Sequence, residues 1–205
     1  MTLHVGDKAP DFSLPSSAGD TVTLSQLTKG RGRTVVVFFY PKDDTPGCIA
    51  EACGFRDLYE EFTRAGAEVV GISADSTASH RRFSGKHELP MKLLTDADGT
   101  VRRAYGVKPT LGVFPGRATF VVDRDGVVRH QFASQLRVVS HVQQALSVRV
   151  LGDQKRFGPE ELHARNSPLA PVGAGWMTRC VRAARCGEAA SPSSISGSCH
   201  DPTLT

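Results

Sequence analysis

The strongest constraint on the fold is a pair of apolar runs separated by a segment with helical periodicity. Thr34 to Phe39 (TVVVFF) and Glu68 to Ser73 (EVVGIS) are short and almost wholly apolar, which is typical of strands buried on both faces. Between them, apolar residues recur at helical spacing from Phe55 to Phe62, and Gly66 follows the last turn. Two parallel strands joined by a helix form a βαβ unit, so the sequence predicts an α/β fold.

The remaining patterns extend this unit into one sheet. Thr21 to Leu24 alternates like a short strand and, with Val5 to Leu14, predicts an N-terminal hairpin. The tetrapeptide DRDG at Asp123 to Gly126 predicts a turn between two antiparallel strands. A further strand is expected over Met91 to Leu94, and helices over Asp75 to His87, Thr100 to Tyr105 and Ser140 to Val150. Together these elements predict a mixed sheet with helices on both faces.

The composition changes near the end of the last expected helix. Beyond about Ser147, Gly, Pro, Ser and Ala dominate and apolar residues lose their period. We therefore expect one folded domain over residues 1–148 and a low-complexity, disordered tail over residues 149–205. The tail contains Cys180, Cys186 and Cys199, whose spacings do not fit a metal site.

Charge and hydropathy exclude several classes of protein. The net charge is only +4, and no block of five or more Lys and Arg residues suggests nucleic-acid binding. No apolar run approaches the ~18 residues of a membrane span, and the start MTLHVGDKAP does not resemble a signal peptide. The cysteine count of 5 is odd, which argues against a secreted disulfide framework. These features predict a protein of a reducing compartment.

The turn after the first apolar run concentrates the reactive chemistry. Pro41 ends the strand because it cannot donate a ladder hydrogen bond. Thr45 and Pro46 then predict a helix start, with Thr45 as the N-cap. Cys48 would lie in the first helical turn, where free N–H groups and the helix dipole favour a thiolate over a thiol. Cys48 is therefore a candidate nucleophile.

The second cysteine of this segment, Cys53, cannot reach Cys48 within an intact helix. The spacing corresponds to an axial rise of about 7.5 Å and a rotation of roughly 500°, whereas a disulfide needs Cα atoms within about 7 Å. A disulfide between them therefore requires the first helical turn to unwind. Two other interpretations stay open: an inert buried cysteine, or a zinc ligand, although the domain lacks a second pair of ligands. The spacing does not match a C-x-x-C redox motif.

The segment Pro41 to Cys48 (PKDDTPGC) resembles the P-x-x-x-T-x-x-C signature of peroxiredoxins. Cys53 makes the chain similar to the Q type, also called the bacterioferritin comigratory protein group, and the resemblance extends over about Leu3 to Leu146. It implies a thioredoxin-like fold. It also implies that Arg117, in the segment PGRATF, is the active-site arginine, whereas sequence context alone favours a surface salt bridge.

The resemblance implies a thiol peroxidase that needs no metal, haem or other cofactor. Cys48 would attack hydrogen peroxide or an organic hydroperoxide and become a sulfenic acid, and Cys53 would form a disulfide that thioredoxin or a similar protein reduces. Thr45 would offer its hydroxyl to the thiolate or the peroxide, Arg117 would stabilise negative charge, and Pro41 would shield the pocket. Glu51 is expected to be a solvated helix residue.

Other properties follow from this resemblance or stay open. Q-type relatives are often monomers, so a monomer is expected, with the cytoplasm as its compartment and the chloroplast as the alternative. Two rival functions are a redox-switched binding or chaperone protein and a thiol-disulfide oxidoreductase acting on proteins. Catalytic turnover of peroxide would distinguish an enzyme from a switch, and reduction of insulin without peroxide would favour the oxidoreductase.

Overall fold

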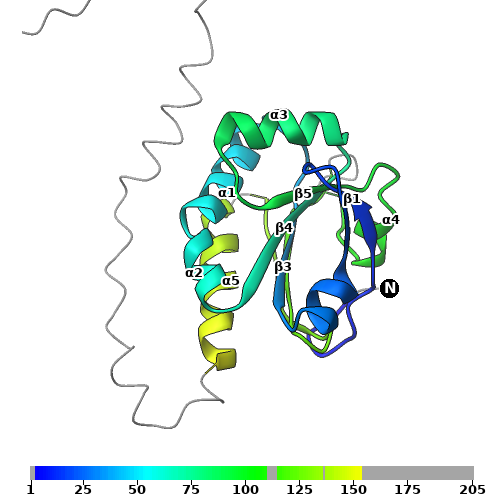
Figure 1. Ribbon diagram of the computed structural model, residues 1–205. Coiled ribbons are helices and arrows are strands. Elements are labelled where there is room, and N and C mark those ends of the chain that lie inside the picture. Colours follow the sequence, from blue (N-terminus) through cyan, green and yellow to red (C-terminus); the bar gives the residue numbers. More distant parts are fainter. Residues whose placement is uncertain (1–2, 110–114, 136, 154–205) are drawn as a thin grey trace, which may run out of the picture.

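The computed structural model describes residues 3–109, 115–135 and 137–153. A five-stranded mixed sheet with strand order β5-β4-β3-β6-β7 forms its centre (Figure 1). β3, β4 and β5 are parallel, and β6 pairs antiparallel with both β3 and β7. The strands are β3 (Thr34–Phe39), β4 (Ala67–Ser73), β5 (Lys92–Thr95), β6 (Ala118–Val122) and β7 (Val128–Ala133). The first apolar run is thus the central strand, with the bounds expected from the sequence.

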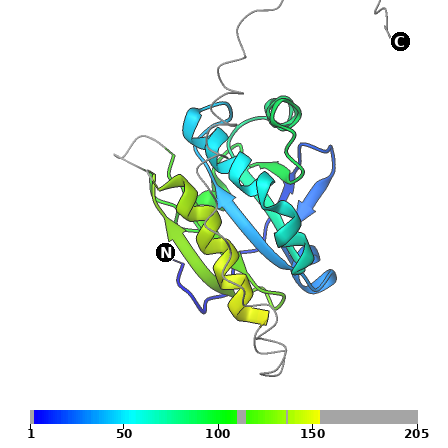
Figure 2. The same cartoon turned by 90° about the vertical axis from the view of Figure 1, so that its left-hand side faces the viewer.

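Helices cover one face of this sheet. The helices α1 (Pro46–Asp57) and α2 (Tyr59–Arg64) run beside α5 (Val138–Asp153) over that face (Figure 2). α3 (Thr77–His87) packs on the edge strand β5 and crosses the top of the molecule in Figure 1. The opposite face carries the hairpin β1 (Ser13–Pro15) and β2 (Thr21–Thr23), the π-helical turn η1 (Gln26–Gly30) and α4 (Thr100–Ala104).

Alternate residues of the central strand belong to two separate apolar cores. Val36 and Phe38 pack with residues of the helices on one face, whereas Val35, Val37 and Phe39 pack with the hairpin side. All five are at most 1% exposed, which explains why the strand is apolar throughout. The prediction of a thioredoxin-like α/β fold with an N-terminal hairpin is confirmed.

Some boundaries differ from the expectations. The helical segment expected before Gly66 is divided at Leu58, between α1 and α2. The domain end expected at residue 148 falls inside α5, and the remaining tail, with its three cysteines, lies outside the described residues. In the described part of the chain, no helix is long and apolar enough to cross a membrane.

Candidate active site

Cys48 lies where the central strand gives way to α1. The chain leaves β3 at Phe39, passes half-buried Pro41 and enters α1 at Pro46, with Thr45 at the N-cap in an extended conformation. Cys48 is therefore in the first helical turn, as expected. Its side chain is only 1% exposed, and the thiol is free. Such a position is typical of a cysteine whose thiolate is stabilised by helix N–H groups.

Arg117 reaches Cys48 because β6 is the antiparallel neighbour of β3. The pairing of Phe39 with Ala118 brings the residue before β6 next to the end of β3. The Arg117 guanidinium donates from Nη2 to Cys48 Sγ at 3.3 Å and from Nη1 to Glu51 Oε2. Arg117 is only 6% exposed, so this cation is withdrawn from water and faces two acceptors.

The expectation that Glu51 is solvated is wrong. Glu51 lies one turn after Cys48 on the same face of α1, and its side chain is fully buried. Burial raises the pKa of Glu51 to about 7, although the neighbouring Arg117 favours the charged form. Burial lowers the pKa of Arg117, but Glu51 and Cys48 more than offset this effect and raise it overall. The Arg117 cation is therefore retained.

His141 from α5 lies behind this pair. Its Nδ1 accepts a hydrogen bond from the Thr119 hydroxyl at 2.8 Å, and its Nε2 donates to the Ser134 carbonyl at 2.8 Å. These partners satisfy the neutral ring, and burial lowers the pKa of His141 to about 4. Glu51 Oε1, which has no hydrogen-bond partner among the described residues, lies 3.7 Å from Nδ1.

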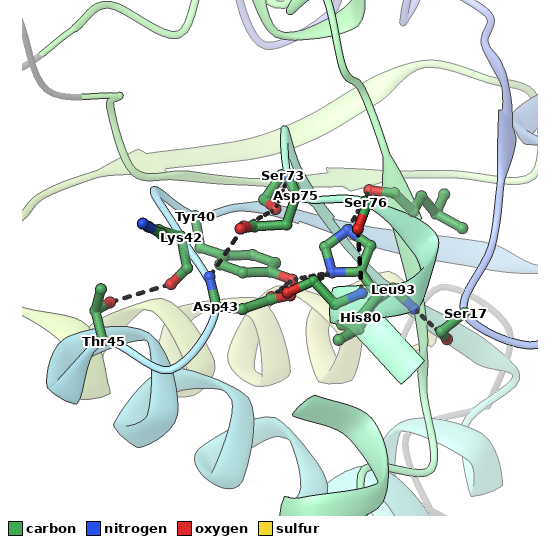
Figure 3. Close-up of polar contacts among 12 residues, drawn as sticks. Ser17, Tyr40, Lys42, Asp43, Thr45, Ser73, Asp75, Ser76, His80 and Leu93 are labelled. Atoms are coloured by element: carbon green, nitrogen blue, oxygen red, sulfur yellow. Dashed lines mark hydrogen bonds and ion pairs between the residues drawn. The ribbon is translucent and has the colours of Figure 1, made fainter. Parts of the chain in front are cut away.

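The Thr45 hydroxyl is hydrogen-bonded to the backbone of its own turn in this structure. It donates to the Lys42 carbonyl at 3.1 Å and so closes the turn before α1 (Figure 3). No hydrogen bond links Thr45 to Cys48 among the residues with described positions. In this reduced state, Thr45 therefore shapes the turn at the helix start.

Cys53 also lies on α1, and both cysteines belong to the apolar core on the helix side of the sheet. The Cys53 side chain is in the reduced form and is 1% exposed. Both cysteines belong to one uninterrupted helix that runs from Pro46 to Asp57. In this state they lie on different sides of the helix, because a spacing of five residues rotates the side chains by roughly 500°.

Arg102 of α4 is a further part of the site that sequence reasoning missed. Its Nη2 donates to the Tyr40 carbonyl at 2.6 Å and its Nη1 to the Gly116 carbonyl at 2.5 Å. Tyr40 follows β3 and Gly116 precedes Arg117, so one side chain joins the two segments that carry Cys48 and Arg117. A basic residue in a short helix gave no sequence signal for this role.

The described residues contain no cluster of three or more His, Cys, Asp or Glu side chains arranged to hold a metal ion. The reacting atom that this site offers is the Cys48 sulfur. A buried sulfur at a helix N-terminus, with a guanidinium beside it, can attack an electrophile while the cation stabilises developing negative charge.

Comparison with known proteins identifies the family. Residues 5–131 match the AhpC/TSA family. The chain belongs to this family. It is 47% identical over 144 residues to a chloroplastic peroxiredoxin Q of Oryza sativa subsp. japonica, covering 70% of this chain and 65% of the rice protein. It is 46% identical over 145 residues to chloroplastic peroxiredoxin Q of Arabidopsis thaliana, covering 70% and 66%. The chain thus spans about two thirds of these relatives.

Solved structures agree with the sequence comparison. Peroxidoxin BcpB of Mycobacterium tuberculosis superposes with a TM-score of 0.66 at 38% identity, covering 73% of this chain and 97% of that one. Peroxiredoxin Q of Xanthomonas campestris gives a TM-score of 0.65 at 31% identity, covering 73% and 96%. The chain is a homologue of peroxiredoxin Q and of the bacterioferritin comigratory proteins, as the cysteine motif indicated.

The comparisons also correct the expected compartment. The rice and Arabidopsis relatives are chloroplastic proteins, and so are those of wheat and poplar, which contradicts the expectation of a cytoplasmic protein. That expectation depended on the first residues of the sequence. A targeting segment leaves no mark on the fold of the domain, and so the segment before the hairpin could not identify the compartment.

Proposed function

We propose that this protein is a Q-type thiol peroxidase that reduces hydrogen peroxide and organic hydroperoxides to water and alcohols. The observation that carries the proposal is the 3.3 Å contact between Arg117 Nη2 and the Cys48 sulfur at the start of α1. The position of this pair within an AhpC/TSA domain supports it. Alkyl peroxide reduction activity is known for the bacterioferritin comigratory protein of Xanthomonas campestris, a structural neighbour at 31% identity, which favours organic hydroperoxides among the substrates.

The first step uses Cys48 and Arg117. The Cys48 thiolate attacks the terminal oxygen of the hydroperoxide, an S–O bond forms and the O–O bond breaks. The leaving oxygen takes the electron pair and then a proton, giving water or an alcohol, and Cys48 becomes a sulfenic acid. The Arg117 guanidinium stabilises negative charge on the sulfur before the attack and on the oxygen during it. Pro41 and Thr45 are proposed to shape the entrance of the pocket.

The second step uses Cys53 and requires α1 to change. After the first turn unwinds, the Cys53 thiol attacks the sulfenic acid, a disulfide forms and water leaves. A dithiol protein such as thioredoxin then reduces the disulfide by exchange. One chain supplies both cysteines, which agrees with the expectation of a monomer.

Disulfide mapping tests both steps. Reduced protein is mixed with one equivalent of hydrogen peroxide, quenched with a thiol-blocking reagent and analysed by peptide mass spectrometry. We expect a Cys48–Cys53 link that thioredoxin reverses. A link from Cys48 to a cysteine of the tail would transfer the resolving role there, and an unoxidised Cys48 would refute the peroxidase.

Two variants separate the roles of the cysteines. Cys48→Ser should abolish peroxide consumption, because the attacking sulfur is missing. Cys53→Ser should consume one equivalent and then stop when thioredoxin is the reductant. Many equivalents consumed by the unchanged protein would exclude a redox switch, and insulin reduction without peroxide would favour the rival oxidoreductase.

A further inference from the structure

Residues 41–45, between β3 and α1, are held by a buried hydrogen bond between Asp43 and His80 that the proposed reaction does not use. We refer to these residues as the active-site loop. Asp43 of this loop is only 5% exposed, although it is an acidic residue in a connecting segment. Figure 3 shows its carboxylate directed away from Thr45 and toward His80 of α3. A buried carboxylate in a loop is costly unless it is fully paired.

Both carboxylate oxygens and the backbone N–H of Asp43 are hydrogen-bonded. One carboxylate oxygen accepts from the Tyr40 hydroxyl at 2.8 Å, and the other accepts from the Ser79 hydroxyl at 2.8 Å and His80 Nδ1 at 3.0 Å. Its backbone N–H donates to Asp75 Oδ2 at 2.9 Å. Burial raises the pKa of Asp43, but the hydrogen bonds from His80 and Tyr40 outweigh burial and lower it overall. The carboxylate is therefore ionised.

His80 is the partner of Asp43 on α3. Its side chain is fully buried, with Nδ1 facing the Asp43 carboxylate and Nε2 facing the Leu94 carbonyl at 3.2 Å. A carboxylate only accepts hydrogen bonds, so Nδ1 donates to Asp43, and the Tyr40 hydroxyl lies 3.2 Å from the same nitrogen. The ring thus connects the active-site loop to both α3 and β5.

The next loop residue is held by the same helix. Asp44 accepts from Lys86 Nζ at 2.9 Å, and His87 Nε2 lies 3.6 Å from the same oxygen. Asp44 also has a φ of 57°, a left-handed conformation that is unfavourable for a residue other than glycine. Two successive residues of the loop are thus attached to α3 immediately before the first turn of α1.

We propose that His80 is a positioning residue, which through its hydrogen bond to Asp43 holds the active-site loop and restrains the unwinding of the first turn of α1. Unwinding that moves Asp43 breaks its buried hydrogen bonds with Tyr40, Ser79 and His80 and leaves these polar groups without their partner, which is unfavourable. The restraint by His80 exists in the reduced protein and does not depend on the reaction. Only its redox consequence rests on the proposed peroxidase function.

The redox consequence concerns the fate of the Cys48 sulfenic acid. In the folded form, a second hydroperoxide can oxidise it by two electrons to a sulfinic acid and release a second water or alcohol. In the unwound form, Cys53 converts it to the disulfide. The Asp43–His80 pair therefore sets the ratio of sulfinic acid to disulfide at a given peroxide concentration.

Amide hydrogen exchange of the reduced protein tests the restraint without any redox step. We compare Asp43→Asn, His80→Gln and the double variant with the unchanged protein at the amides of residues 49–53. Each single variant should exchange about tenfold faster there, since a hydrogen bond to a charged group contributes more than a neutral one. The double variant should exchange no more than about twofold faster than the faster single variant, because both remove the same pair.

Two control variants separate the restraint from general loss of stability. Ser84→Ala removes a hydrogen bond from α3 to the Leu89 carbonyl but does not touch the loop. Ile72→Val trims the core on the opposite face of the sheet, and it should lower global stability by a similar amount without selective exchange at residues 49–53. Selective exchange in Ile72→Val equal to that in His80→Gln, or additive effects in the double variant, would overturn the proposal.

The second measurement is the product ratio after exposure to increasing hydrogen peroxide. His80→Gln should form about tenfold less sulfinic acid per disulfide than Ile72→Val, because opening is easier. An unchanged ratio despite faster exchange would overturn the redox part of the inference. Faster exchange together with no Cys48–Cys53 disulfide in any variant would support the restraint and refute the proposed peroxidase cycle.

Discussion

At the scale of the residue, Arg117 contacts two acceptors with one side chain. Its two terminal nitrogens donate separately to the Cys48 sulfur and to Glu51. A planar guanidinium presents such donors in a fixed fork, whereas the ammonium of lysine is a single compact charge. The shape of this side chain, as well as its charge, is therefore required to orient it toward the thiol.

We expect Arg117→Lys to slow the oxidation of Cys48 by peroxide about a hundredfold, because a preorganised donor at the reacting atoms is lost. The measurement is the second-order rate of thiol loss, followed by alkylation and mass spectrometry. Arg33→Lys is a matched control, since Arg33 forms a partly exposed ion pair with Glu68 away from the site. Equal rates for the two variants would show that charge alone suffices.

His141 makes the free energy of unfolding fall at acid pH. Its pKa is about 4 when folded and 6.5 in the reference state, so the folded protein binds fewer protons between these values. The stability from this group is therefore present above pH 6.5 and is lost as the pH falls toward 4. Glu51 acts in the opposite direction, because its raised pKa of about 7 makes stability fall as the pH rises from 4.5.

His141→Gln should flatten the acid side of this profile. The glutamine amide can still accept from Thr119 and donate to Ser134, but it does not titrate. The free energy of unfolding, measured by urea denaturation between pH 4 and 6.5, should decline less than in the unchanged protein. Replacement of exposed His4 by glutamine should leave the slope unchanged, and a slope that is equally steep in His141→Gln would contradict the assignment.

At the scale of the element, the segment that leads into β6 depends on one glycine. A Cβ on Gly116 would lie 1.9 Å from the Lys108 carbonyl oxygen, so no side chain fits there. Gly116 immediately precedes Arg117, and its own carbonyl accepts from Arg102. The close approach of Gly116 to Lys108 therefore fixes the backbone position from which the Arg117 side chain extends.

Gly116→Ala should destabilise the protein by about 1–3 kcal/mol, the usual cost of overpacking, and slow Cys48 oxidation by displacing Arg117. Thermal unfolding and thiol-oxidation rates check the two effects. Gly85→Ala is the matched control, because Gly85 is exposed within α3 and a Cβ there meets no atom within 4 Å. That change should stabilise the helix by about 0.5–1 kcal/mol.

Local patterns predicted the elements but not the buried polar contacts between them. The bounds of β3 and the start of α1 follow from an apolar run and from Thr45 and Pro46. The burial of Glu51 and His80 could not be inferred, because their partners are distant in sequence. Glu51 pairs with Arg117 and His80 with Asp43, and these contacts arise from strand order and helix placement.

At the scale of the whole molecule, α1 is part of the packed core, whereas the proposed reaction requires its first turn to unwind. It packs against α5, and its buried residues include Cys48, Ile49, Cys53 and Phe55. A disulfide between the two cysteines must distort this helix and disturb the core around it. Oxidation should therefore loosen the domain, although a disulfide usually stabilises a folded protein.

We expect the oxidised protein to unfold at a lower temperature than the reduced protein and to bind more of a dye that detects apolar surface. Scanning calorimetry and dye fluorescence check these effects on the same sample. Cys53→Ser, treated with one equivalent of peroxide, provides the control because it lacks the second cysteine. A higher unfolding temperature for the oxidised protein would show that the disulfide forms without loss of core packing.

Arg102 links the hairpin side of the sheet to the active site, so the two parts of the domain cannot be exchanged independently. Arg102 belongs to α4 on the hairpin side of the sheet. Its guanidinium nevertheless donates to the Tyr40 carbonyl, before the active-site loop, and to the Gly116 carbonyl, before Arg117. A chimera that exchanged the segment around α4 with that of a distant homologue would leave Cys48 and Arg117 themselves unchanged. It would nevertheless change the spacing of thiol and guanidinium, so grafting the reactive motif alone onto another sheet should not transfer its reactivity.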